Sequence, residues 1–190
     1  MIKSLDECFV FVRNGVSIKQ FDGKGIPITR IESISNEYLN LSKLGYANIY
    51  NEDYKEYYLK NGDILMSHIN SQKHLGKTAI IENLDMKIIH GMNLICLRAD
   101  IKKIIPEYIF YFFKTQIFKK NIIKISKKSV NQASFSISDL KKIKVEVPTL
   151  MQQERVVKRL NRIKKIIENR KKQIKLFDEL IKSRFLEVIK

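Results

Sequence analysis

The chain has 190 residues, of which 44% are hydrophobic and 29% charged, a balance typical of a folded protein rather than a disordered one. No apolar run is long enough to span a membrane, and the acidic N-terminus lacks the apolar core of a signal peptide. The cysteines, Cys8 and Cys96, lie far apart in apolar runs, which predicts reduced core residues. We therefore expect a cytoplasmic protein with one core-forming domain and room for a further element.

The formal net charge of +16 lies wholly in the second half of the chain. Residues 1–101 hold 12 Lys or Arg and 12 Asp or Glu, whereas residues 102–148 hold 11 and 3, and residues 149–190 hold 13 and 5. A local basic excess favours a polyanionic partner, of which nucleic acid is the commonest. A solvated, lysine-rich surface is the alternative that charge alone leaves open.

The first hundred residues predict a series of short strands. Asn61-Gly62 predicts a tight turn because both residues tolerate positive φ, so we expect Asp63 to be a turn residue rather than a catalytic acid. The segment "HLGK" at residues 74–77 predicts another turn. The predicted strands are runs rich in β-branched and aromatic residues, at 8–12, 26–31, 63–69, 78–82 and 93–97.

The pattern changes at Pro106. Residues 106–120 predict one helix, with Pro106 at its first position and lysines in its last turn, where they complement the helix dipole. A polar basic loop follows at residues 126–136. One helical turn is then predicted at residues 138–143, and the alternation at residues 143–147 predicts a half-buried strand.

A long helix is predicted from residue 150 to residue 190. Thr149 is a natural N-cap, and Gln152 stands three residues later, which completes a capping box. Apolar residues then recur mostly at spacings of three and four, a heptad-like pattern that Arg170 interrupts. We call this stripe the seam, and it consists of Val156, Leu160, Ile163, Ile167, Ile174, Phe177, Ile181, Phe185 and Val188.

These patterns predict an α+β protein, with a β-rich domain and short helices over residues 1–148 and one long C-terminal helix over residues 149–190. Such a helix is roughly 60 Å long, whereas a domain of this size is only about 35 Å across. We therefore expect the helix to project and its seam to need a partner, which is either a second copy of the chain or a helix of another protein. A helix folded back on its own domain is the alternative.

The sequence lacks the patterns of a catalytic or metal site. His68, His74 and His90 have no metal-ligand spacing, and neither cysteine stands near one of them. Neither a glycine-rich phosphate loop nor the Asp/Asn-Pro-Pro-aromatic motif of an amino-methyltransferase occurs. The acid-x-Lys triplets at residues 53–55 and 85–87 are expected by chance in a chain so rich in charge. We therefore expect a non-catalytic chain without a metal or a cofactor.

Four segments follow one another in a characteristic order: "RNGVSIKQ" with "GIPITRIESIS", "YYLKNGDILMSHINSQKHLGKTAII", "HGMNLICLR" and "SVNQASFSISDLKKIKVEVPTLMQQERVVKRL". This order resembles the DNA-specificity subunit of type I restriction–modification systems, from the start of a target-recognition domain to its closing segment and conserved helix. The most specific piece is the Ile/Val-Pro-x-Leu-x-x-Gln-x-x-Val/Ile pattern before the long helix. The resemblance covers nearly the whole chain.

Members of that family commonly hold two recognition domains and two conserved helical regions, whereas this chain has one of each. The resemblance therefore implies that two copies pair through antiparallel helices, which also dock methyltransferase subunits, and that the pair reads a bipartite target in double-stranded DNA. It also implies that the chain has no chemistry of its own. A methyltransferase subunit would modify adenine with S-adenosylmethionine, and a separate restriction or motor subunit would cleave unmodified DNA with ATP.

Two loops carry side chains suited to DNA, because Asn and Gln pair with adenine, and Arg and Lys pair with guanine or with phosphates. We predict base contacts from Gln72, Lys73 and His74, and phosphate contacts from Lys127 and Lys128. The first loop supplies Asn70, Ser71, Gln72, Lys73, His74 and Lys77. The second supplies Lys127, Lys128, Ser129, Asn131 and Gln132.

Three of the DNA candidates have alternatives. Asn131 and Gln132 could instead bond the backbone of their own loop. Arg30 lies in a predicted strand and could pair with an acid rather than with DNA. Two functions of other classes also remain open at this point: a coiled-coil adaptor or regulator that binds an acidic protein through its basic helix, and a nuclease.

Overall fold

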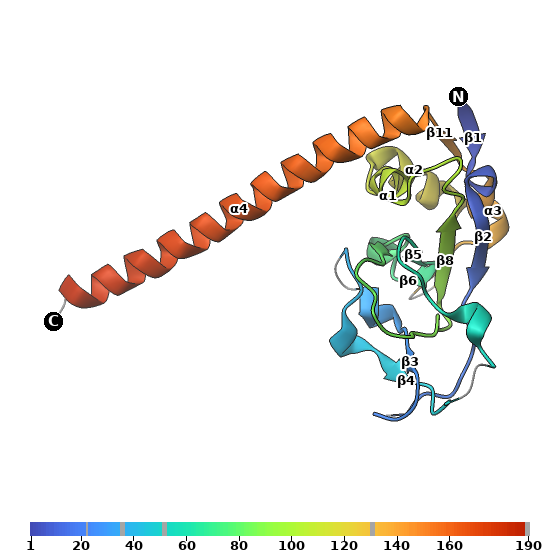
Figure 1. Cartoon of the computed structure of the whole chain (residues 1–190), viewed down its shortest axis with the longest axis horizontal. Helices are drawn as coiled ribbons and strands as arrows, with labels where there is room; N and C mark the ends of the chain where they lie inside the picture. Colours follow the sequence, from blue (N-terminus) through green and yellow to red (C-terminus); the bar gives the residue numbers. More distant parts are fainter. Residues whose placement is uncertain (22, 35–36, 51–52, 130–131, 189–190) are drawn as a thin grey trace. The chain divides into compact units, whose positions relative to one another are not determined.

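The computed structural model describes residues 1–190 except residues 22, 35–36, 51–52, 130–131 and 189–190, and except the side chain of residue 186. The chain divides into two compact units, Met1–Leu150 and Met151–Lys190. The first unit is β-rich with short helices, and the described part of the second belongs to one continuous helix, α4 (Leu150–Val188) (Figure 1). This confirms the predicted α+β fold class with a single long C-terminal helix. None of the helices in the described part of the chain has the length and hydropathy that a membrane span requires.

The centre of the first unit is a four-stranded antiparallel sheet in the order β2-β8-β5-β7. Figure 1 shows β2 beside β8, the longest pair. Four of the five predicted strand runs fall on this sheet, although their ends shift. The strands are β2 (Phe9–Asn14), β8 (Leu94–Ala99), β5 (Ile64–Ser67) and β7 (Thr78–Ile80).

Both faces of this sheet are covered by apolar side chains, which explains why β5 is buried at all four positions. Successive side chains of a strand point to opposite faces, so register partners form rows across the sheet. One row, buried in the larger apolar cluster, consists of Val12, Leu97, Ile64 and Ile80. The neighbouring row, buried in a second cluster on the opposite face, includes Cys96, Leu65 and Ala79. Both cysteines are buried and free, as predicted.

The segment predicted as one helix at residues 106–120 forms two helices, so that prediction was wrong. Thr115 is the reason, because its hydroxyl donates to the carbonyl of Phe112 at 2.8 Å and accepts from the amide of Phe118 at 3.2 Å. The same side chain thus satisfies a carbonyl at the end of one helix and caps the start of the next. The two helices are α1 (Pro106–Phe113) and α2 (Gln116–Ile125).

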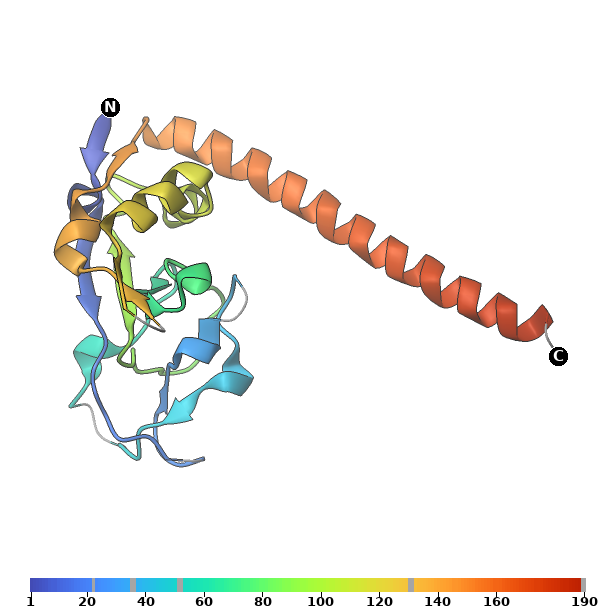
Figure 2. The same cartoon turned by 180° about the vertical axis from the view of Figure 1, so that it is seen from behind.

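Aromatic rings bind these two helices to each other and to the sheet. The ring centroids of Phe113 and Phe118 are 4.6 Å apart, and Phe113 also stacks on Phe9 of β2 at 6.4 Å. Figure 2 shows α1 and α2 in yellow tones, next to one another. A third helix, α3 (Ile137–Lys142), confirms the predicted helical turn, and the hydroxyl of Ser136 caps it.

The two ends of the first unit are joined by a short ladder. Strand β1 (Ile2–Ser4) pairs antiparallel with β11 (Lys144–Glu146), which lies within the strand predicted at residues 143–147. The amide of Val147 also donates to the carbonyl of Met1 at 2.7 Å. The segment that leads into α4 is therefore hydrogen-bonded to the N-terminus of the chain.

A smaller lobe packs around Ile28, Ala47 and Ile89. The strand predicted at residues 26–31 is only two residues long there, because the chain turns into a 3-10 helix at Ile31. The lobe's short strands are β3 (Pro27–Ile28) and β4 (Gly45–Tyr46). The 3-10 helices of the unit are η1 (Leu5–Cys8), η2 (Ile31–Ile34), η3 (Leu41–Lys43), η4 (Lys55–Tyr57) and η5 (Gln72–His74).

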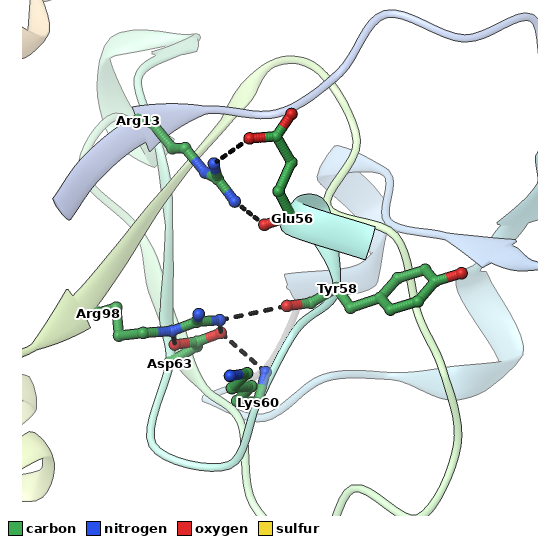
Figure 3. A network of polar contacts seen from close by, with 6 residues as sticks. All are labelled: Arg13, Glu56, Tyr58, Lys60, Asp63 and Arg98. Carbon is green, nitrogen blue, oxygen red and sulfur yellow. Dashed lines mark hydrogen bonds and ion pairs between the residues drawn. The ribbon is translucent and has the colours of Figure 1, made fainter. Parts of the chain in front are cut away.

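Asp63 is a structural turn residue, as the Asn-Gly signal predicts. Gly62 has φ +87, and the side chain of Asp63, 1% exposed, accepts from the amide of Lys60 at 2.8 Å. Arg98 donates to both carboxylate oxygens of Asp63 at 2.7 Å and to the carbonyl of Tyr58 at 3.1 Å (Figure 3). This bidentate pair ties the turn to β8 and engages both oxygens of the buried carboxylate.

Candidate nucleic-acid interface

A three-stranded ribbon brings together the two loops that the sequence marks as DNA candidates. Its order is β6-β10-β9, and it links segments that are far apart in the sequence. Asn70 is the register partner of Ala133, which is in turn the partner of Lys128. The strands are β6 (Ile69–Asn70), β10 (Ala133–Ser134) and β9 (Lys127–Lys128).

The first loop, residues 70–77, has a fixed backbone, and we call it the 70–77 turn. The amide of His74 donates to the carbonyl of Ser71 at 2.9 Å, and the amide of Gly76 donates to the carbonyl of Ser67 at 2.8 Å. The Oδ1 atom of Asn70 accepts from the amide of Ser71 at 2.7 Å, so Asn70 shapes the start of the turn. Turn formation at residues 74–77 is confirmed.

Most side chains of this turn are exposed to solvent rather than engaged in contacts within the chain. Those of Ser71, Gln72, Lys73 and His74 are exposed, and that of Lys77 is half-buried. Among the described residues, the side chains of Gln72, Lys73 and His74 form no hydrogen bond or ion pair with the rest of the chain. A rigid backbone with unengaged donors loses little conformational freedom when it meets a ligand.

Strands β9 and β10 pair antiparallel on the two sides of the second loop, and we call this pair the hairpin. Both the amide and the hydroxyl of Ser129 donate to the carbonyl of Gln132, at 2.8 and 3.0 Å. Ser129 is therefore a closing residue of the hairpin, whereas the side chains of Lys127, Lys128 and Gln132 are exposed. Asn131, also predicted to contact DNA, lies outside the described residues.

Arg30 belongs to the smaller lobe and not to the ribbon. It follows β3 and is not in a strand, so its predicted strand position was wrong. Its Nε atom donates to Oε1 of Gln20, an amide instead of the acid considered as an alternative, and its own amide donates to Ser33 Oγ at 2.9 Å. The structure therefore does not group Arg30 with the other DNA candidates.

Two of the three histidines are structural. Burial lowers the pKa of His90 to about 4, and its Nε2 atom lies 2.9 Å from the carbonyl oxygen of Leu94. Burial also lowers the pKa of His68, whose ring packs edge-on against Phe135. Only His74 is exposed. In the part of the chain that the structure describes, no three His, Cys, Asp or Glu side chains are grouped to hold a metal ion.

The basic excess of residues 102–148 is of two kinds. Four lysines pair with carboxylates at 2.7 to 3.3 Å; they are Lys103, Lys114, Lys141 and Lys142. Seven others are exposed, and within the described residues they form no ion pair: Lys119, Lys120, Lys124, Lys127, Lys128, Lys102 and Lys144. The first three lie on α2, which directly precedes β9. Lys119 and Lys120 fall within the helix predicted at residues 106–120, where the pattern relates them to the helix dipole and not to DNA, and Lys124 lies beyond the predicted end of that helix.

The seam predicted on the long helix lies on α4 at all nine positions. At about 100° per residue, its members fall within an arc of about 100° on the helix surface. Apart from Leu160, which is half-buried, they are exposed, from Val156 at 38% to Val188 at 83%. Five further exposed apolar residues of the helix lie outside this arc: Leu150, Met151, Ile166, Leu176 and Leu180.

Comparisons with known proteins agree on one family. The family profile described as "Type I restriction modification DNA specificity domain" matches residues 2–176. A putative type I restriction enzyme specificity subunit, MjaX, of Methanocaldococcus jannaschii is 41% identical over 181 residues, which cover 94% of this chain and 42% of that protein. The EcoKI specificity subunit of Escherichia coli is 25% identical, over 86% of this chain and 36% of its own length.

Solved structures share the fold. A chain from a structure of a type I restriction–modification system superposes with a TM-score of 0.65 at 18% identity, over 88% of this chain and 39% of that one. The S subunit of M. genitalium superposes with a TM-score of 0.60 at 15% identity, over 89% and 40%. This chain thus spans less than half the length of the relatives it matches. It belongs to the family of type I restriction–modification DNA specificity domains.

Proposed function

We propose that this chain recognises a DNA sequence as a specificity subunit of a type I restriction–modification complex, and that it is not itself an enzyme. The observation that carries this proposal is the match to the DNA-specificity family over nearly the whole chain. The ribbon supports it independently, because β6, β10 and β9 unite two segments rich in exposed donors and cations.

The residues of the interface divide by role. Gln72, Lys73 and His74 contact base edges from the 70–77 turn, since side chains with fixed donors and acceptors discriminate bases in the major groove. Lys127 and Lys128 contact backbone phosphates, which provides affinity without sequence information. Asn70 and Ser129 shape the backbone of their loops. Ser71, Lys77, Asn131, Gln132 and Arg30 remain candidates for additional contacts.

The seam of α4 pairs with the same seam of a second copy in antiparallel orientation. Exposed apolar residues along one arc of a helix need a partner, because amphipathic helices gain most of their stability from packing. Two copies related by a two-fold axis would present two recognition units to one duplex, so the target is two short half-sites with an unread gap. The same helix docks the methyltransferase subunits, and the complex includes a restriction or motor subunit.

Selection from a pool of random duplexes tests this function. The purified chain, alone and together with co-purified methyltransferase subunits, is incubated with the pool, and the retained DNA is sequenced. We expect an enriched inverted repeat with a gap of constant length. If neither experiment enriches a sequence, the proposal is contradicted. A chain that binds no DNA but binds an acidic protein tightly would favour the adaptor function instead.

A further inference from the structure

A groove of about 450 Å³ lies between the 70–77 turn and helix α2. Its floor is apolar, and Phe113, Phe118 and Ile122 contribute to it. The lining also includes four basic side chains, which come from both elements: Lys73, His74, Lys77 and Lys119. No Asp or Glu lines it among the residues that the structure describes. The groove thus combines an apolar surface with a positive rim.

The distance between the two walls of the groove is fixed by a close contact. Gly76 has φ +72, and a Cβ atom placed on it would lie 3.2 Å from Cγ1 and 3.3 Å from Cγ2 of Ile122. Ile122 is itself 3% exposed and packs in the main core, as does Phe118. Neither wall can shift far without disturbing the core, because protein interiors are close-packed.

Lys119 is the contribution of α2 to the rim of the groove. Its side chain is exposed and forms no ion pair with the described residues, whereas Lys114, in the linker just before α2, binds Glu37 at 2.7 Å. The ammonium group of Lys119 is therefore available for an external anion. Lys124, on the same helix, is also exposed and forms no ion pair with the described residues, but it does not line the groove.

We infer that this groove holds one stretch of the sugar–phosphate backbone of DNA, with Lys119 bound to a phosphate and the apolar floor against a deoxyribose. The inference rests on the proposed function. A deoxyribose presents carbon atoms and a phosphate presents anionic oxygens, which match the floor and the rim respectively. The contact fixes the register of the duplex, and the Gly76–Ile122 contact holds that register relative to Gln72, Lys73 and His74.

The test combines a protein change with a change in the DNA backbone. A selected duplex is prepared as a series in which one phosphate at a time is replaced by a neutral methylphosphonate. Affinities are measured for the full-length protein and for Lys119→Ala, with Lys124→Ala as the matched control. For the unaltered protein and for Lys124→Ala, we expect the methylphosphonate at one position, next to the bases that face the 70–77 turn, to weaken binding about tenfold. In the Lys119→Ala variant, a methylphosphonate at that position should cause no further loss of affinity.

The outcomes separate this inference from the proposed function. In one outcome, sequence-specific binding persists while every methylphosphonate weakens Lys119→Ala as much as the unaltered protein. In that case the groove does not hold the backbone, but the specificity function stands. If Lys124→Ala abolishes the effect of the same methylphosphonate, the effect comes from the overall positive charge of the helix, and the inference is again wrong. If the unaltered protein prefers no sequence, the proposed function fails and the inference fails with it. Thermal unfolding of each variant establishes that the surface changes leave the fold intact.

Discussion

At the scale of single residues, two arginines connect the segment before β5 to the sheet, one through a buried carboxylate and one through an exposed carboxylate. Asp63 and Arg98 form the clearest buried pair, since each oxygen of the carboxylate has a guanidinium donor. Arg13 instead lies over the rings of Phe11 and Tyr57 and reaches the mostly exposed Glu56. Both arginines hold the segment before β5 against the sheet. The attachment at Asp63 is the stronger one, because Asp63 is buried whereas Glu56 is mostly exposed.

Asp63→Asn should lower the free energy of unfolding by about 2–3 kcal/mol, because it leaves the charge of Arg98 without its partner. Urea denaturation measures this change. Glu56→Gln is the control, and it should cost at most about 1 kcal/mol because the pair with Arg13 is exposed. Equal losses in the two variants would show that the Asp63 pair is not the stronger anchor.

The burial of His90 should make stability depend on pH. Its pKa, about 4 in the folded chain, is below the ordinary value of 6.5, so the unfolded chain binds the proton more readily between these values. The contribution is complete above pH 6.5 and is lost as pH falls towards 4, by an amount of the order of 3 kcal/mol. His68 contributes in the same direction.

Urea denaturation between pH 4 and pH 7 checks this prediction. His90→Gln should flatten the dependence, whereas His74→Gln, which changes an exposed histidine, should leave it as in the unaltered protein. A His90→Gln variant with the full pH dependence would assign the effect to other groups.

At the scale of elements, the proposed roles of the two loops predict separate effects on affinity and on sequence choice. Lys127→Glu with Lys128→Glu should weaken binding to all duplexes alike and reduce the salt dependence of binding, since phosphate contacts release counterions. Gln72→Ala should instead relax the choice of base at one position of each half-site, at a cost of about 1–3 kcal/mol for the preferred base.

Binding of selected and scrambled duplexes over a range of salt concentrations distinguishes these effects. Gln116→Ala serves as the control, because Gln116 is an exposed amide on α2 that belongs to neither loop. If neither the lysine pair nor Gln72 alters binding, the ribbon is not the DNA-contacting element.

The elements also show what the sequence predicts and what it does not. Apolar runs such as residues 63–69 and 93–97 predict strands because sheet burial requires them. The helix from residue 150 is predicted by its long periodicity. The break at Thr115 is missed because one hydroxyl outweighs a continuous helical pattern, and each strand of the ribbon is two residues long, which is too short for any periodicity.

The grouping of the site follows from pairing and not from local sequence. Residues of both loops can be selected for their chemistry, but only the partnership of Asn70 with Ala133, and of Ala133 with Lys128, places them together. Arg30 has equally suitable chemistry and lies elsewhere, bound to Gln20. Composition identifies candidates, and long-range hydrogen bonding decides which of them lie together.

At the scale of the whole molecule, the seam of α4 predicts self-association. Ile174→Gln should raise the dissociation constant of the dimer about a hundredfold, because a two-fold interface loses the buried side chain in both copies. Leu176→Gln is the matched control, with a similar exposure of 63% against 61% but a position outside the seam.

Sedimentation equilibrium over a range of protein concentrations measures both constants. Equal weakening by the two changes would mean that the seam is not the pairing surface, and a monomeric unaltered chain at all concentrations would contradict pairing of identical copies.

The ladder between β1 and β11 has a consequence for how such a unit can be rearranged. Because the segment that enters α4 is bonded to the first residue of the chain, the unit has its entry and its exit on a single edge. A module of this kind can be exchanged as one piece between two junctions, one at Met1 and one beside Val147, because the two junctions are neighbours. New specificities could then arise by exchange of whole cassettes, without redesign of the scaffold that carries them.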